Sequence, residues 1–224
     1  MAGFTLCGVD DRPVRLEVHG LRRHFGDRIA VRDLSLTLLA GDCVALAGPN
    51  GAGKSTALRL LAGLLPPHAG TGRVVDCDLR NIDFRTRNAI GFLPQRSALY
   101  GRLSALENLR FRAAIAGLRD PVRQANAVAG ALQLGRRAME RLERLSGGWV
   151  RRIELAATLI HDPLLILLDE PTTGLDEPAR DAIWAQLDAH RAAGAAVVFT
   201  SHDIAEIGRA RSVVPLQSAA ERAR

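Results

Sequence analysis

The chain has 224 residues, of which 47% are hydrophobic, 24% charged and 4% aromatic. This composition indicates one globular domain with a sizeable core and excludes a disordered chain, a collagen and a small disulfide scaffold. The net charge of +6 would suit nucleic acid or an anionic membrane surface. Because the basic residues are scattered along the chain, we favour a solvated Arg-rich face and expect no nucleic-acid partner.

The apolar segments are short and the cysteines are widely spaced. The aliphatic run at residues 164–168 falls far below the roughly 20 apolar residues that a membrane-spanning helix needs. The N-terminus lacks the basic and apolar regions of a signal peptide, so a cytosolic location is expected. Cys7, Cys43 and Cys77 contain no CxxC pair, which argues against a disulfide framework and a zinc site.

The first predicted elements are strands. Residues 14–39 alternate apolar and polar side chains, which predicts antiparallel strands. Residues 43–48 form a short apolar run, which predicts a buried strand. Apolar spacing then predicts a helix over residues 55–65.

The loop between that strand and helix has the pattern G-x-x-x-x-G-K-S. Its glycines let backbone N–H groups point at phosphate oxygens, and the helix adds the positive end of its dipole. Lys54, the single lysine of the chain, would reach the β- and γ-phosphates, and Ser55 would ligate Mg²⁺. A compact ammonium suits this loop better than a planar guanidinium. The predicted nucleotide-binding residues here are Gly48, Pro49, Asn50, Gly51, Ala52, Gly53, Lys54, Ser55 and Thr56.

Residues 96–157 have a helical pattern. Ser104 is expected to cap a helix over residues 105–116, and Asp120 precedes a helix that starts at Pro121. Leu-Ser-Gly-Gly-Trp at 145–149 leads into a further helix. Ser146, Gly147 and Gly148 there offer either a second anion site or a plain N-cap worth about 1 kcal/mol. Both interpretations use the same atoms, so the sequence leaves them open.

A buried strand over residues 164–168 ends in two acids, Asp169 and Glu170. Such a strand delivers carboxylates to the C-terminal edge of a parallel sheet, where ligands bind in α/β folds. Asp169 would hold Mg²⁺ through water or through Ser55, and Glu170 would polarise the attacking water. Another strand is predicted near residue 195, and Pro215 weakens the last one.

From about residue 14 to 214 the chain resembles the nucleotide-binding subunit of ATP-binding cassette (ABC) transporters, of the export type found in bacteria. The resemblance implies an aromatic Phe25 that stacks on adenine beside Val31, and a Gln95 that contacts Mg²⁺ and the water. It also implies that Asp176 belongs to a nucleotide-contacting loop and that His202 contacts the γ-phosphate. Taken singly, Phe25, Gln95 and His202 would more often be ordinary structural residues.

The fold implied by the resemblance is α/β. It is a P-loop NTPase with a RecA-like parallel sheet and flanking helices, an antiparallel β subdomain and an inserted α-helical subdomain. Residues 1–95 and 158–216 would form the core with its N-terminal antiparallel strands. Residues 96–157 would form the helical subdomain, and residues 217–224 a frayed tail.

The function implied is hydrolysis of MgATP by Lys54, Gln95, Glu170 and His202. In the family, ATP closes a head-to-tail dimer in which the lysine loop of one subunit faces the Ser-Gly-Gly turn of the other. The partners expected are therefore a second cassette, identical or different, and a separate transmembrane permease. The location expected is peripheral, on the cytoplasmic face of the inner membrane. Trp149 departs from the family, which mostly has Gln there.

Two other functions stay open at this point. The chain would also suit a soluble, non-transport ABC ATPase that acts as an assembly or regulatory switch. A nucleotide-binding module without turnover is disfavoured because Glu170, Gln95 and His202 are all present. The segment at residues 100–109 and the Leu-Ser-Gly-Gly-Trp variant resemble those of export cassettes, so export is expected over import. The transported molecule is not readable from these motifs.

Overall fold

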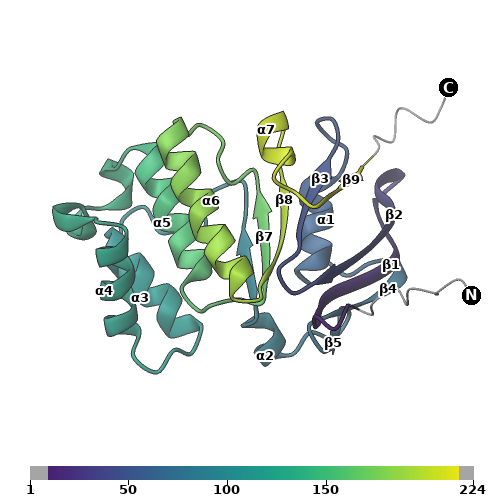
Figure 1. Ribbon diagram of the computed structural model, residues 1–224, viewed down its shortest axis with the longest axis horizontal. Coiled ribbons are helices and arrows are strands. Elements are labelled where there is room, and N and C mark those ends of the chain that lie inside the picture. Colours follow the sequence, from purple (N-terminus) through teal and green to yellow (C-terminus); the bar gives the residue numbers. More distant parts are fainter. Residues whose placement is uncertain (1–9, 217–224) are drawn as a thin grey trace, which may run out of the picture.

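The computed structural model describes residues 10–216 and places a parallel sheet between an antiparallel sheet and a group of helices (Figure 1). The strands are β1 Val14–Phe25, β2 Arg28–Leu39, β3 Cys43–Ala47, β4 Ala69–Val74, β5 Cys77–Asp78, β6 Ile90–Leu93, β7 Leu165–Asp169, β8 Ala196–Thr200 and β9 Ser212–Pro215. The helices are α1 Lys54–Leu61, α2 Phe84–Arg87, α3 Ala105–Ile115, α4 Pro121–Ala131, α5 Gly147–Leu159, α6 Glu177–Ala192 and α7 Ile204–Ile207, with the 3-10 turns η1 Gly135–Met139 and η2 Leu142–Arg144. Among these residues no helix combines the length and apolar character needed to cross a bilayer.

The central sheet has the strand order β6-β7-β8-β3-β9, and all of its pairings are parallel. Every residue of β7 and β8 is buried. This explains their unbroken apolar sequences, because a parallel sheet is covered on both faces. The predicted α/β class is confirmed. Pro215 ends the edge strand β9, a position where a missing N–H is tolerated.

The second sheet has the order β2-β1-β4-β5 with antiparallel pairings. The long β1–β2 hairpin confirms the strands predicted over residues 14–39. The sequence analysis assigned no element to β4, whose residues include Gly70 and Gly72 and show no apolar alternation. A Cβ at Gly72 would press against Val18 of β1, so the close approach of β1 requires a glycine there.

Three groups of buried side chains hold the layers together. One packs α1 between the two sheets, and a second fills the opposite face of the parallel sheet under α5 and α6. The third lies among α3, α4 and α5. Helix α5 contributes to two of them, through Leu155 toward the sheet and Ile153 toward the other helices. Helix α5 therefore joins the group of helices to the parallel sheet.

The largest difference between predicted and observed helix boundaries is at the end of α1. Helix α1 ends at Leu61 instead of residue 65. Gly63 takes a left-handed φ of 64°, and a side chain at this position would collide with Ile82. That glycine stops the helix. Helices α3 and α4 begin as predicted, capped by Ser104 and Asp120 through hydrogen bonds from the N–H groups of Glu107 and Arg123.

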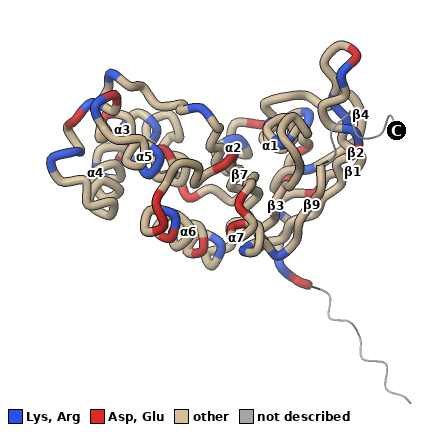
Figure 2. The backbone as a smooth tube through the Cα atoms, turned by 90° about the horizontal axis from the view of Figure 1, so that it is seen from above, with Lys and Arg blue, Asp and Glu red and all other residues tan. Residues whose placement is uncertain are grey.

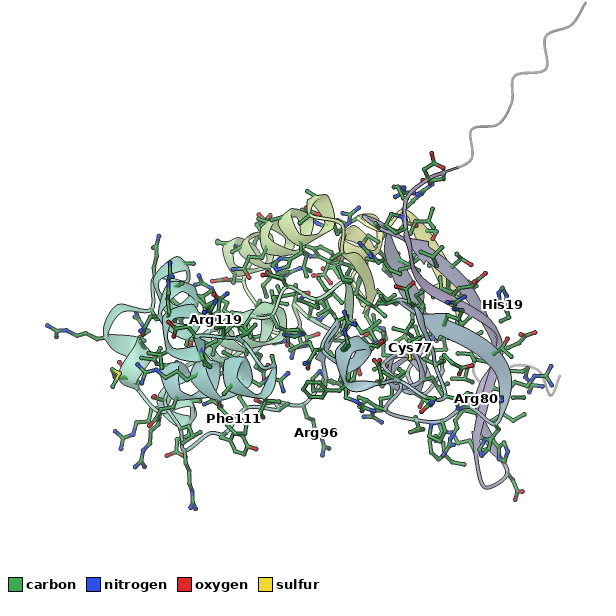
Figure 3. All side chains as sticks on the ribbon, turned by 90° about the horizontal axis from the view of Figure 1, so that it is seen from below. His19, Cys77, Arg80, Arg96, Phe111 and Arg119 are labelled. Atoms are coloured by element: carbon green, nitrogen blue, oxygen red, sulfur yellow. The ribbon has the colours of Figure 1, made fainter. Side chains whose placement is uncertain are left out.

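Charged residues are spread along the whole described backbone, with acidic and basic positions interspersed (Figure 2). Large apolar side chains are also exposed at several places along the chain, from Val14 in β1 to Val213 in β9. Phe84, Tyr100, Phe111 and Ile115 are all exposed. Figure 3 shows Phe111 projecting from the molecule on the side where Arg96 also points outward. The predicted tail, residues 217–224, and Cys7 lie outside the described residues.

Candidate nucleotide-binding and catalytic site

The glycine-rich loop wraps around the side chain of Lys54. Its Nζ donates hydrogen bonds to the carbonyls of Gly48, at 2.7 Å, and Pro49, at 3.2 Å. Gly53 has a φ of 92°, and a side chain there would collide with the Ala30 carbonyl of β2. The loop therefore closes against β2 only with glycine at that position, and this closure aims the N-terminus of α1 at the space in front of the loop.

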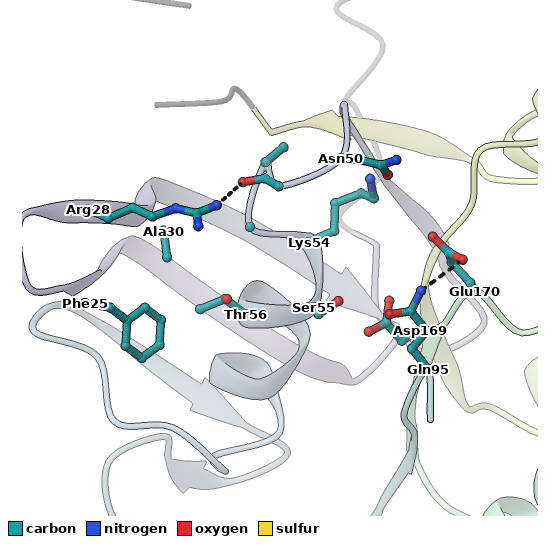
Figure 4. Close-up of a pocket in the computed structure, with 13 residues that line it drawn as sticks. Phe25, Arg28, Ala30, Asn50, Lys54, Ser55, Thr56, Gln95, Asp169 and Glu170 are labelled. Carbon is teal, nitrogen blue, oxygen red and sulfur yellow. Dashed lines mark hydrogen bonds between the residues drawn. The ribbon is translucent and has the colours of Figure 1, made fainter. Parts of the chain in front are cut away.

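That space is a pocket of about 450 Å³, within the range of natural ligand sites (Figure 4). It is lined by Phe25, Arg28, Ala30, Asn50, Gly51, Ala52, Gly53, Lys54, Ser55, Thr56, Gln95, Asp169 and Glu170. Phe25 lies at one end and is 48% exposed, and the Arg23 guanidinium lies over its ring at 5.0 Å from the centroid, which leaves one ring face to stack on a base. The two acids lie at the other end.

Val31 does not line this pocket. It is 3% exposed and belongs to the core between the sheets, whereas its neighbour Ala30 lines the pocket. The reason is that successive residues of a strand face opposite sides. Arg28, which the sequence analysis did not single out, also lines the pocket and donates to the Gly51 carbonyl at 3.2 Å.

At the carboxyl edge of the sheet, Thr200 orients both acids. Its Oγ1 donates to Asp169 Oδ1 at 2.8 Å and accepts from the Glu170 N–H at 2.9 Å. Ser55 and Asp169 line the same part of the pocket as Gln95 (Figure 4). A hydroxyl, a carboxylate and an amide oxygen are the hard oxygen donors that Mg²⁺ prefers, so the predicted magnesium ligands fit this ion.

The Glu170 carboxylate is where the predicted catalytic residues meet. Its Oε2 accepts from Gln95 Nε2 at 3.4 Å, and its Oε1 lies 3.1 Å from His202 Nε2. The same His202 nitrogen lies 3.3 Å from Lys54 Nζ. Since Nε2 either donates or accepts, one tautomer serves the carboxylate and the other the ammonium. The structure thus gathers Lys54, Gln95, Glu170 and His202 from separate segments of the chain.

The Ser-Gly-Gly turn borders a different pocket, of about 320 Å³. Its lining residues are Ser146, Gly148, Trp149, Arg152, Asp176, Pro178, Ala179 and Ala182. Ser146 holds the N-cap position of α5, yet its side chain makes no capping hydrogen bond. This favours the anion-site interpretation over a plain N-cap. Gly147 is exposed on the same turn.

Asp176 shares this second pocket and caps α6, accepting from the Ala179 N–H at 3.1 Å. Trp149 has the guanidinium groups of Arg137 and Arg152 near its ring, 4.9 and 4.4 Å from the centroid. Two cations therefore accompany the residue that departs from the family pattern.

Two supporting residues escaped the sequence analysis. Nothing in the sequence distinguishes Thr200 from other polar residues that stand at the ends of buried strands. Arg151 is a buried arginine of α5 that pairs with Glu154 at 3.0 Å. No sequence signal singles out Arg151, because Arg152 stands next to it and a pair of opposite charges three residues apart is common on exposed helix faces.

The comparisons with known proteins agree with this geometry. The sequence profile described as ABC transporter matches residues 31–173. The chain belongs to the ABC transporter family. This chain is 39% identical over 196 residues to the Nod factor export ATP-binding protein I of Cupriavidus pinatubonensis. The aligned region covers 87% of this chain and 60% of that protein. The protein of the same name from Bradyrhizobium diazoefficiens is 39% identical over 198 residues, covering 87% and 64%.

Solved structures give the same family. The ATP-binding subunit of an ABC transporter superposes with a TM-score of 0.82 at 28% identity, over 91% of this chain and 87% of that one. A dimeric, post-hydrolysis ATP-binding cassette bound to ADP and Pi gives a TM-score of 0.81 at 25% identity, over 91% and 96%. The ABC chain spans less than two thirds of the length of the two curated relatives named above. The P-loop NTPase fold expected from its motifs is confirmed.

Proposed function

We propose that this chain is the ATP-binding and ATP-hydrolysing subunit of a bacterial ABC exporter, and that it drives a separate membrane subunit through ATP-dependent dimerisation. The observation that carries the proposal is the Glu170 carboxylate, which lies within 3.4 Å of Gln95 and 3.1 Å of His202 in the pocket that contains Lys54. A module that only bound nucleotide would not need a carboxylate placed in this way.

Each residue has a part in the proposed reaction. The Lys54 ammonium and the loop N–H groups bind the β- and γ-phosphates, while Phe25 stacks on the base. Glu170 accepts a proton from the attacking water, which the Gln95 amide orients. His202 donates a hydrogen bond to the γ-phosphoryl oxygens and so offsets their growing charge.

Magnesium would be held by Ser55 and Asp169, with Gln95 next to them. When bound, it neutralises charge on the phosphate oxygens. Thr200 keeps the Asp169 carboxylate oriented toward this position, since its hydroxyl bonds Oδ1 at 2.8 Å.

A shared site between two cassettes explains why one protomer has two anion pockets. The first contains Lys54, and the second contains Ser146, Gly148 and Asp176. In a head-to-tail dimer the second pocket of one protomer would close over the triphosphate in the first pocket of its partner. The similarity to a dimeric cassette bound to ADP and Pi supports this arrangement.

The export direction and the permease partner rest on relatives and on surface chemistry. The curated relatives are named as export ATP-binding proteins. The aromatic rings of Tyr100 and Phe111 are exposed, and their centroids lie 5.2 Å apart on the segment that follows Gln95. This apolar pair would provide a binding surface for a permease helix. The subunit would then sit peripherally on the cytoplasmic face of the inner membrane.

Two variants of the full chain test this function. Glu170→Gln should keep nucleotide binding but lose turnover by about 100-fold or more, because the amide cannot accept the proton. It should also dimerise in MgATP, as measured by light scattering. Lys54→Ala should lose both binding and turnover. A Glu170→Gln protein that stays monomeric at saturating MgATP would refute the dimer mechanism.

A further inference from the structure

We propose that Arg151 is a positioning residue for ATP hydrolysis, which holds the backbone of Glu170 and of Gln95 in place from the helix that begins at the Ser-Gly-Gly turn. This inference rests on the proposed ATPase function. Arg151 does not line the nucleotide pocket, so it would act through the two residues that do.

Arg151 lies in the first half of α5 and is 9% exposed. A guanidinium has five N–H donors in a planar fork. The hydrogen bonds run from Nε to Pro171 O at 2.9 Å, from Nη1 to Pro94 O at 3.1 Å and Glu154 Oε2 at 3.0 Å, and from Nη2 to Asp169 O at 2.9 Å and Glu170 O at 2.8 Å. The number of acceptors equals the number of donors, so the group has a single defined orientation.

Toward the catalytic strand, Arg151 binds the carbonyls of three consecutive residues, 169–171. The middle one, Glu170, has a φ of 49°, a left-handed conformation that residues with a side chain rarely adopt. Such a conformation persists only where the surroundings impose it. Arg151 at the Glu170 carbonyl and Thr200 at the Glu170 N–H hold both ends of this residue. The direction of the catalytic carboxylate therefore depends on Arg151.

Toward the glutamine, Arg151 binds the carbonyl of Pro94. This carbonyl belongs to the peptide bond that joins Pro94 to Gln95, so fixing it fixes the start of the Gln95 side chain. The Gln95 amide and the Glu170 carboxylate are 3.4 Å apart. One guanidinium thus determines the relative placement of the two groups that would bind the attacking water.

The chemistry calls for arginine rather than another cation. Lysine presents a compact point charge with three donors on one nitrogen, which cannot supply the five hydrogen bonds that Arg151 makes from three nitrogens. Glu154 balances the buried charge, with side-chain exposures of 10% for Arg151 and 5% for Glu154.

The test compares Arg151→Lys with the charge-free pair Arg151→Met/Glu154→Met, in the full chain. The double variant removes the Arg151–Glu154 ion pair together with the hydrogen bonds from Arg151 to the backbone. Because it leaves no buried charge without a partner, it guards against a failure to fold. Arg15→Lys is the matched control, because Arg15 also donates to a backbone carbonyl, that of Gly194, and Gly194 precedes β8 at the end of the sheet opposite Thr200. Turnover is measured against MgATP concentration and divided by the sites that bind a fluorescent ATP analogue.

In both Arg151 variants we expect kcat per binding site to fall by about tenfold or more, with KM within about twofold of the parent. The Lys54 loop is untouched, so binding should survive. The control should keep the parental kcat. A residue needed only for folding would lower the number of binding sites and leave kcat per site unchanged.

Two results would overturn the proposal. One is a folded double variant whose kcat per site equals that of the parent. The other is a loss confined to KM, which would place Arg151 in substrate binding. A parent that binds the analogue but never turns over would instead overturn the ATPase function, and the role of Arg151 with it.

Discussion

A single buried hydroxyl, that of Thr200 at the end of β8, supports Asp169 and Glu170 at the end of the neighbouring strand β7. It bonds Asp169 Oδ1 and the Glu170 N–H while lying fully buried. The arrangement of the two acids thus relies on a residue that performs no chemistry itself.

We predict that Thr200→Val destabilises the protein by about 2 kcal/mol, because it leaves a carboxylate oxygen and an N–H group buried without partners at almost unchanged volume. Urea unfolding followed by circular dichroism measures the loss. ATP turnover should fall as well, since the carboxylates are no longer held.

Thr200→Ser is the matched control for this prediction, because it keeps the hydroxyl and removes only a methyl group. It should retain most of the turnover. Equal stability of the Val and Ser variants would show that the hydrogen bonds of Thr200 contribute nothing measurable.

Among the elements, α3 depends on its first turn for a defined start. Ser104 and Glu107 form a capping box: Ser104 Oγ accepts from the Glu107 N–H at 3.2 Å, and Glu107 Oε2 accepts from the Ser104 N–H at 2.7 Å. The hydrogen bond from the Ser104 backbone, followed by that from its side chain, lowers the pKa of Glu107 below its ordinary value of 4.5. The box is therefore strongest with Glu107 ionised.

This shift predicts a pH dependence of stability. Because the pKa of Glu107 is lower in the folded protein than its ordinary value of 4.5, ionised Glu107 stabilises the folded state. This stabilisation is fully present above pH 4.5 and is lost as the pH falls through the pKa of Glu107 in the folded protein. The advantage of the parent over Glu107→Gln in thermal midpoint should therefore shrink from neutral pH toward about pH 3. Glu143→Gln, at an exposed acid beyond this box, should show a smaller change over the same range. A constant difference between parent and Glu107→Gln would contradict the prediction.

For the whole molecule, the decisive feature is that the two pockets proposed to bind the triphosphate have no lining residue in common. It predicts complementation between two inactive variants. Lys54→Ala disables the first pocket and Gly148→Asp the second. A Cβ added at Gly148 would lie 3.6 Å from the Leu175 side chain, an ordinary contact distance, so we expect the fold to tolerate the substitution. In a mixed head-to-tail dimer one of the two shared sites is intact.

Mixing equal amounts should therefore restore about a quarter of the parental ATPase activity, since half of the dimers are mixed and each has one working site. Steady-state phosphate release measures the recovery. The two variants assayed separately are the controls. If the mixture is as inactive as its parts, each protomer works alone and the shared site is wrong.

The sequence by itself determined the strands with unbroken or alternating apolar residues, the caps of α3 and α4, and the glycine-rich loop around Lys54. These are local patterns, in which the residues that decide the structure lie within a few positions of one another. Family resemblance then supplied Phe25, Gln95 and His202, which local pattern alone would not distinguish from ordinary structural residues.

Only the tertiary structure decided the rest. Strand β4 forms because β1 offers it an edge, and Val31 points into the core because of the register of β2. Arg151 and Thr200 form hydrogen bonds with Asp169 from 18 and 31 residues away. Contacts of this kind depend on how distant segments pack, and no periodicity or spacing in the chain records them.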